Sequence, residues 1–151
     1  MIPFRGRKTE VSAMTLKRIL FIDDEVLLRM AMVPGLEDAG YTVDEAGTGR
    51  RALEIFRTRH AEIFCAIIDL GLPDMKGDSL VPEFRALSPQ LGIVLATGYG
   101  DADLVRTFSS DPGVRVVAKP YFPEELATAI AMVGIIPPST KDADISAIRS
   151  A

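Results

Sequence analysis

The chain of 151 residues has little cysteine and histidine, no long uninterrupted apolar run and no excess of basic residues. It contains one cysteine, one histidine and no tryptophan. This composition excludes an internal disulfide and leaves too few nitrogen and sulfur ligands for a zinc site, which typically uses about four. Lysine and arginine number 17 against 21 aspartates and glutamates, so the net charge is -4 and the basic excess typical of nucleic-acid binding is missing. No apolar run reaches the roughly 18–20 residues of a membrane span.

The two ends of the chain differ in composition from its middle. Residues 1–16 lack the apolar core of a signal peptide, and we expect a flexible arm in which Met14 is an alternative start. Residues 135–151 are expected to form a polar C-terminal tail. Cys65 lies in an apolar run, where a thiol behaves as a small buried hydrophobe. These features predict one cytoplasmic domain over residues 17–134, with no nucleic-acid or membrane partner.

Short apolar runs alternate with segments of helical periodicity. The run at residues 41–46 alternates apolar and polar side chains, which predicts a half-exposed strand near an edge of a sheet. The other runs are nearly continuous in Ile, Val and Leu, as in strands buried on both faces, and lie at residues 18–22, 63–69, 91–97 and 114–119. Helices are predicted at residues 25–39, 48–59, 78–87, 101–110 and 122–133. This alternation predicts an α/β fold with a parallel sheet that helices cover on both faces.

The first two predicted helices carry start and stop signals. Residues 25–39 place Leu27 among the apolar side chains expected to face the core, and the pattern stops at Gly40. Pro34 is expected to kink this helix, because proline lacks a backbone donor and clashes with the preceding turn. Thr48 is the expected N-cap of the second helix.

Polar side chains follow four of the predicted strands at the point where each strand ends. They comprise three acids after the first strand and then an acid, a hydroxyl and an amine: Asp23, Asp24, Glu25, Asp69, Thr97 and Lys119. Singly, each is ordinary at a helix start, a turn or a strand exit. A parallel sheet brings such ends to one edge, where clustered carboxylates repel unless a cation lies among them. Oxygen ligands favour Mg²⁺, whereas His60, at a predicted helix end, is expected at the surface.

An aspartate beside a divalent cation, a hydroxyl and an ammonium indicates phosphoryl transfer. Carboxylates can act as nucleophiles that form acyl phosphates, and such transfers depend mainly on positioning and charge neutralisation. In this hypothesis Asp69 is the nucleophile. The cation and Lys119 neutralise phosphoryl oxygens, and Thr97 donates a hydrogen bond to another.

The order and spacing of short motifs resemble a known family. The motifs are DDE at 23–25, DLGLPDMKG at 69–77, LATG at 95–98 and KP at 119–120. From about residue 17 to 133 the chain resembles the receiver domain of two-component response regulators. The resemblance implies a flavodoxin-like receiver fold, a doubly wound five-stranded parallel sheet of order 2-1-3-4-5.

The resemblance also implies roles for individual residues. Asp69 is expected to be the phosphoacceptor, with Thr97 and Lys119 holding the phosphoryl group. The implied Mg²⁺ site takes Asp24 as a direct ligand, Asp23 through water, the backbone carbonyl of Gly71, and Asp69. The bond between Lys119 and Pro120 is expected to be cis, which is uncommon, at about 5–6% of X–Pro bonds.

One position departs from the family pattern. Val116 stands on the fifth strand where typical receivers carry Tyr or Phe, so the usual aromatic switch is missing. The segment VLATGYG is similar to the FATGUY subclass, although Leu95 replaces its leading Phe. Tyr99 is either a substitute switch, acting with residues 98–110, or a half-exposed loop aromatic. The candidate output surface comprises 101–108, the fifth strand and 122–133, and its expected anchors are Leu104, Phe108 and Tyr121.

The favoured hypothesis is a single-domain response regulator, a signalling protein rather than an enzyme, which takes part in its own phosphorylation and dephosphorylation. Its expected partners are a histidine kinase or histidine phosphotransfer protein and an unknown downstream protein. One alternative is a receiver-shaped interaction module that works without phosphorylation. Another, a Mg²⁺-dependent phosphatase of the haloacid-dehalogenase kind, is disfavoured because Gly71 stands where its second acid is needed.

Overall fold

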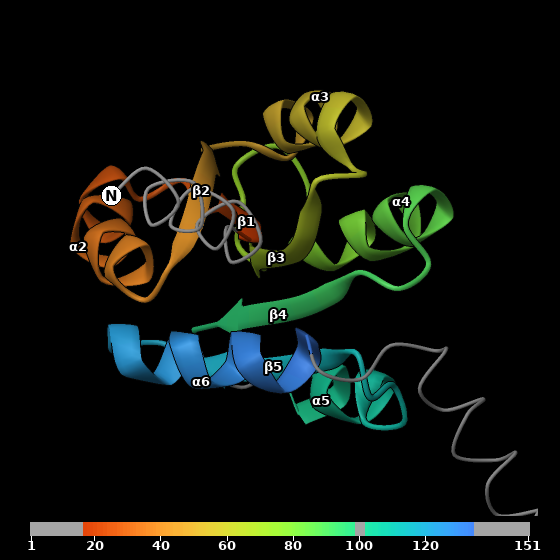
Figure 1. The fold of residues 1–151 in the computed structure, drawn as a ribbon. Helices are drawn as coiled ribbons and strands as arrows, with labels where there is room; N and C mark the ends of the chain where they lie inside the picture. Colours follow the sequence, from red (N-terminus) through yellow and green to blue (C-terminus); the bar gives the residue numbers. More distant parts are fainter. Residues whose placement is uncertain (1–16, 99–101, 135–151) are drawn as a thin grey trace, which may run out of the picture.

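A parallel sheet forms the centre of the molecule (Figure 1). The computed structural model describes residues 17–98 and 102–134, so Tyr99 and the expected terminal segments 1–16 and 135–151 lie outside the described residues. The sheet has five strands in the order β2-β1-β3-β4-β5, which confirms the predicted topology. The strands are β1 (Lys17–Ile22), β2 (Tyr41–Ala46), β3 (Ile63–Asp69), β4 (Gly92–Thr97) and β5 (Val114–Ala118).

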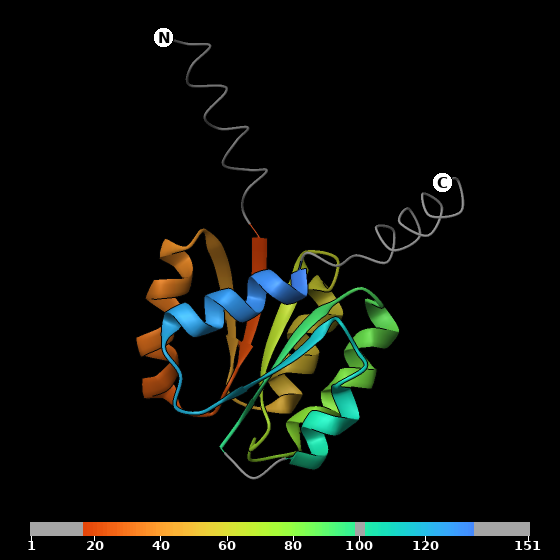
Figure 2. The ribbon, with the colours of Figure 1, turned by 90° about the horizontal axis from the view of Figure 1, so that it is seen from below.

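Helices cover both faces of the sheet. They are α2 (Val26–Asp38), α3 (Gly49–Arg59), α4 (Leu80–Leu87), α5 (Ala102–Phe108) and α6 (Pro123–Gly134), together with a short 3-10 helix, η1 (Gly77–Ser79). In Figures 1 and 2, α2 and α6 lie on one side of the sheet, and α3, α4 and α5 lie on the other. The arrangement is the doubly wound α/β fold that the alternation of strands and helices predicted.

Strand burial follows the position of each strand in the sheet. Every residue of β4 is buried, as are all residues of β3 except Phe64, because strands and helices surround them. The edge strand β2 is mostly half-exposed, as its alternating sequence predicted. The prediction for β5 was wrong: only Val114 of this strand is buried. Its apolar sequence suggested a central strand, but β5 has β4 as its one neighbour in the sheet.

The helix ends confirm most of the local signals. The Thr48 hydroxyl accepts a hydrogen bond from Arg51 N–H at 3.0 Å and caps α3. Gly40 ends the α2 segment with φ of 102°, a conformation that glycine adopts at little cost. Pro34 lies inside α2, which continues to Asp38.

Leu27 does not face the core as predicted, since it is 80% exposed. The buried residues of α2 are Met32 and Leu36. Leu36 follows Leu27 by nine positions, about two and a half helical turns, so the two side chains point in opposite directions. The start of α2 is apolar on more than one face, and periodicity alone could not select the buried one.

Two apolar cores flank the sheet. On the side of α3 and α4, the Phe56 and Phe84 rings stack with centroids 4.2 Å apart, and both side chains are fully buried. On the side of α2 and α6, Met32 and Leu36 pack with Leu126 and Ile130. Cys65 is fully buried in this second core, as its apolar context predicted. Among the described helices, none is long and apolar enough to cross a membrane.

Replacing Phe84 tests the packing of the first core. We expect Phe84→Ala to lower the free energy of unfolding by about 3–5 kcal/mol, because it leaves a cavity against Phe56. Leu87→Ala, on the same helix but at a side chain that is 43% exposed, is the matched control and should cost under about 1 kcal/mol. Urea unfolding followed by circular dichroism measures both. Equal losses would contradict the assignment of Phe84 to the core.

Candidate functional site

The polar side chains singled out at the strand ends lie together at the carboxyl edge of the sheet. The strands run in parallel, so their carboxyl ends share one edge (Figure 2). Asp23 follows β1, Asp69 ends β3, Thr97 ends β4, and Lys119 follows β5. Asp23, Asp69 and Thr97 are buried, which is uncommon for polar side chains. The structure therefore places these predicted residues in one site.

Lys119 joins the acids of this site through its ammonium group. Its Nζ lies 2.9 Å from Asp23 Oδ2, 3.1 Å from Glu25 Oε1 and 3.3 Å from Asp69 Oδ1. Burial on its own lowers the pKa of Lys119, but hydrogen bonds to Asp23 and Glu25 and the charges of Asp23 and Asp69 outweigh it and raise the pKa. The ammonium therefore keeps its charge at neutral pH.

Lys119 and Thr97 are also fixed through their backbones. Lys119 N–H donates to the Thr97 carbonyl at 2.8 Å, which extends the pairing of β4 and β5 by one residue. The bond between Lys119 and Pro120 is cis, as the resemblance implied.

Asp69 presents a recessed carboxylate. It is 6% exposed, and its Oδ1 accepts a hydrogen bond from Gly71 N–H at 3.1 Å. Burial raises the pKa of Asp69 above its usual range. The Gly71 hydrogen bond lowers it, the Asp23 charge raises it, and Lys119 lowers it, with a net increase. The ionised form of Asp69 therefore carries a cost that a bound cation would relieve.

Asp23 and Asp24 complete an acidic group with Asp69. One oxygen from each of these three carboxylates lies within 4.8 Å of the others. Asp23 is fully buried, and its Oδ1 accepts a hydrogen bond from Glu25 N–H at 2.8 Å. Its other oxygen, Oδ2, is buried and lies 2.9 Å from the Lys119 ammonium. Asp24 is exposed.

This donor set fits a hard divalent cation. The ligand oxygens belong to carboxylates, two of which are buried, and Mg²⁺ prefers such ligands together with water. The Lys119 ammonium contacts three carboxylates, those of Asp23, Glu25 and Asp69, and Asp24 lies beside them as a fourth acid. A cation would offset the remaining negative charge.

A glycine allows the loop after β3 to pass close to Asp69. Gly77 N–H donates to the Leu70 carbonyl at 3.1 Å. A Cβ atom at Gly77 would overlap the Asp69 carbonyl group and come within 2.9 Å of an Ile68 side-chain carbon. Only glycine fits here, and the close approach folds the loop back beside the acid. Gly71, near the start of this loop, is exposed.

Two residues of the site were missed in the sequence. The Arg29 guanidinium donates a hydrogen bond to the Asp23 backbone carbonyl, and its Nε lies 2.9 Å from Glu45 Oε1. It therefore ties the segment that follows β1 to β2. The Asp74 carboxylate binds the first backbone amides of α3. Arg29 is isolated in sequence from its partners, but Asp74 lies within the DLGLPDMKG motif, which could have pointed to it.

The predicted output anchors differ in burial, which excludes one of them and leaves the other two as predictions. Tyr121 is 4% exposed and packs with the core beside α2 and α6, so it cannot serve as a surface anchor. Leu104 and Phe108 are half-buried and pack against the other core. Val116 is half-buried at the position where an aromatic was expected.

The fold and this group of acids, hydroxyl and lysine agree with one protein family. The family model for the response regulator receiver domain matches residues 19–131. The chain belongs to this family. As a receiver it is related to the signalling proteins of two-component systems, and the resemblance inferred from the four motifs is confirmed.

Individual relatives agree with the family match. The receiver is 32% identical over 112 residues to the sensor kinase CckA of Brucella abortus (strain 2308), covering 74% of this chain and 12% of that protein. It is 27% identical over 118 residues to the chemotaxis protein CheY of Thermotoga maritima, covering 78% of this chain and 97% of that protein. A receiver domain protein from Clostridium thermocellum superposes with a TM-score of 0.70 at 28% identity, covering 76% and 91% of the two chains. The receiver spans less than half the length of several curated relatives, namely 12%, 23% and 46% of three of them.

The raised pKa of Asp69 predicts a pH-dependent effect of neutralising it. Because its pKa is higher in the folded than in the unfolded chain, the Asp69 contribution to stability is full below the unfolded pKa and is lost as pH rises through the folded pKa. Asp69→Asn keeps an acceptor for Gly71 N–H and removes the charge. We expect it to raise the melting temperature at about pH 7 and to do so less at about pH 3. A lower melting temperature than that of the wild type at neutral pH would contradict the electrostatic account.

Proposed function

We propose that this receiver accepts a phosphoryl group on Asp69 in a reaction that needs Mg²⁺ and that it signals through protein contacts as a single-domain response regulator. The observation that supports this most is the Asp69 carboxylate, which lies recessed between the Lys119 ammonium and the acids after β1. The donor is a phosphohistidine of a histidine kinase or of a histidine phosphotransfer protein. The proposed setting is the cytoplasm.

The chemistry forms one bond and breaks another. A carboxylate oxygen of Asp69 attacks the phosphorus atom, and the bond between phosphorus and the donor imidazole nitrogen breaks. The imidazole keeps the electron pair, and Asp69 becomes an acyl phosphate. Water later attacks the phosphorus, the bond between phosphorus and the Asp69 oxygen breaks, and inorganic phosphate leaves. Asp69 is a carboxylate again, so the receiver takes part in its own dephosphorylation.

Four residues would hold the ion in this proposal. They are Asp23, Asp24, Asp69 and Gly71, the last through its backbone carbonyl. When bound, Mg²⁺ supplies positive charge that offsets the carboxylates and the phosphoryl oxygens. Burial of Asp23 and the hydrogen bond from Gly71 to Asp69 fix two of these residues before the ion arrives.

Lys119 and Thr97 would hold the phosphoryl group. The Lys119 ammonium already contacts Asp69 Oδ1, so it needs little movement to pair with an oxygen of a phosphoryl group on that carboxylate. Thr97 ends β4, and its backbone carbonyl binds Lys119 N–H, which sets the two residues at neighbouring strand ends. Its hydroxyl would donate to a second phosphoryl oxygen.

The proposed output surface comprises α5, β5 and α6. A groove between β5 and α6 is lined by Val116, Val117, Thr128 and Met132, and Val105 of α5 is exposed. Phosphorylation at Asp69 would act on this surface through Lys119, which directly follows β5. A downstream protein would bind here.

Incubation with acetyl phosphate and Mg²⁺ tests the phosphoacceptor. We expect the intact mass to rise by one phosphoryl group in the wild type and not in Asp69→Asn, because the amide is not a nucleophile. Asp111→Asn, at an acid that pairs with Arg85, is the control and should gain the phosphoryl group normally. Chelation of the ion should prevent the gain. A wild-type mass that stays unchanged would favour the alternative module that works without phosphorylation.

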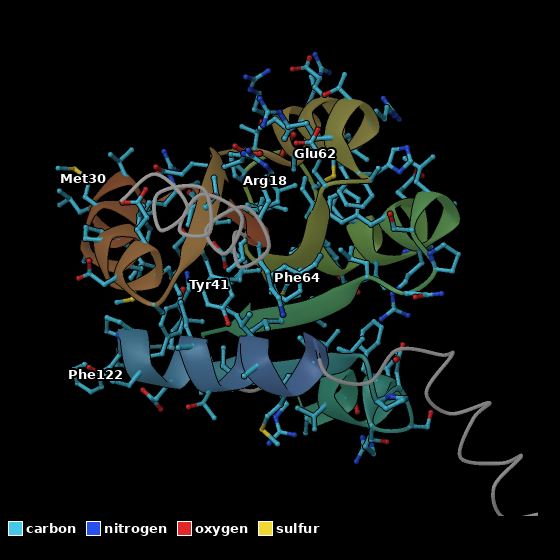
Figure 3. The ribbon with its side chains drawn as sticks, in the orientation of Figure 1. Arg18, Met30, Tyr41, Glu62, Phe64 and Phe122 are labelled. Atoms are coloured by element: carbon cyan, nitrogen blue, oxygen red, sulfur yellow. The ribbon has the colours of Figure 1, made fainter. Side chains whose placement is uncertain are left out.

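The start of α2 offers a contact for the donor. Glu25 touches Lys119, and the following residues Val26, Leu27 and Met30 are exposed apolar side chains on α2. Figure 3 shows Met30 on the outer side of this helix. Since Asp69 is recessed, a protein that brings a phosphohistidine to it must cover the rim of the site, and burying these side chains would favour that contact.

Leu27→Asp tests this contact. We expect it to slow phosphoryl transfer from a purified phosphohistidine protein about tenfold or more, since it buries a charge at the interface, and to leave labelling by acetyl phosphate unchanged. Leu87→Asp, at an exposed leucine on α4, is the matched control and should transfer at the wild-type rate. An equal loss with acetyl phosphate would assign the defect to the site itself and contradict the proposed contact.

A further inference from the structure

The loop between β3 and η1 is anchored to α3 by Asp74. Gly49 N–H donates to Asp74 Oδ1 at 2.9 Å, and Arg50 N–H donates to Asp74 Oδ2 at 3.0 Å. The next amide of the helix, Arg51 N–H, donates to Thr48. The first three backbone amides of α3 thus find their hydrogen-bond acceptors in two residues. Thr48 is the N-cap of the helix itself, and Asp74 belongs to the loop that follows Asp69.

A second contact strengthens this anchor. The Met75 side chain lies against Gly49, where a Cβ atom would come within 2.5 Å of Met75 Cγ. At its far end, the loop is fixed by Gly77, whose N–H donates to the Leu70 carbonyl at 3.1 Å. The loop is therefore held at two places, by Asp74 and Met75 against α3 and by Gly77 against Leu70, which follows Asp69.

Gly71 lies in the part of this loop between Leu70 and Asp74. Its N–H donates to Asp69 Oδ1 at 3.1 Å, so the position of the loop also sets the orientation of the reactive carboxylate. The Asp74 carboxylate is charged at neutral pH, because the backbone hydrogen bonds from Gly49 and Arg50 lower its pKa. A charged acceptor makes the stronger kind of hydrogen bond to the α3 amides.

We infer that Asp74 is a positioning residue for the phosphorylation site: by clamping the loop to the start of α3, it holds Gly71 where its amide orients Asp69 and its carbonyl reaches the cation. This inference rests on the proposed function, in which Gly71 and Asp69 bind Mg²⁺. It also makes α3 part of the support of the site, although that helix contributes no residue to it.

Three variants separate positioning from helix stability. Asp74→Ala removes both acceptors of the clamp. Thr48→Ala removes a cap from the same helix end without touching the loop and is the matched control. Asp74→Asn keeps one oxygen acceptor and is expected to give an intermediate result.

Mg²⁺ affinity by calorimetry and amide hydrogen exchange at Gly71 are the readouts. We expect Asp74→Ala to raise the Mg²⁺ dissociation constant about tenfold, the lower end of the range for residues that orient metal ligands, and to speed exchange at Gly71 even without the ion. Thr48→Ala should lower the melting temperature yet keep the wild-type dissociation constant and Gly71 exchange rate.

The outcomes distinguish this inference from the function on which it rests. Wild-type affinity and Gly71 exchange in Asp74→Ala, or equal losses in Thr48→Ala, would overturn the positioning role and leave the proposed function standing. A wild-type protein that shows no saturable Mg²⁺ binding would overturn the proposed function, and the inference with it.

Discussion

The contact of the Lys119 ammonium with the carboxylates of Asp23, Glu25 and Asp69 is the interaction on which the site depends. It joins residues from the ends of three strands that are far apart in the sequence. Without it, buried Asp23 and recessed Asp69 would face each other with no positive charge in contact. With it, the site still carries more negative than positive charge, and a bound cation would offset the excess.

The sheet is built so that this contact can form. β1, β3 and β4 lie in the middle of the sheet, and buried polar residues of the site, namely Asp23, Asp69 and Thr97, stand at their carboxyl ends. Two separate apolar cores hold the helices on the two faces, so the rigidity of the strand ends does not depend on the charged site. The helices contribute to the site in different ways. α2 begins directly after the acids that follow β1, whereas the first amide of α3 binds Asp74 in the loop that follows Asp69.

Local patterns in the sequence were sufficient for much of this structure. Continuous apolar runs located β3 and β4, Thr48 and Gly40 located helix ends, and four motifs located the site. Sequence patterns failed where the burial or the contacts of a residue depend on residues that are distant in sequence but close in space. The β5 sequence resembles that of a central strand although β5 lies at an edge. Leu27 lies at the start of a helix that is apolar on more than one face, and Tyr121 packs into the core beside α2 and α6. Asp74 was passed over for the same reason, because its partners lie at the start of a helix more than twenty residues away.

The central claim is that the strand ends form one site for a divalent cation beside Asp69, and a magnesium titration followed by backbone amide resonances tests it most directly. The account predicts saturable changes with a single dissociation constant, largest at Asp24, Asp69 and Gly71. Resonances that do not move, or that move only around His60 and Ser88 at the opposite ends of the strands, would contradict it.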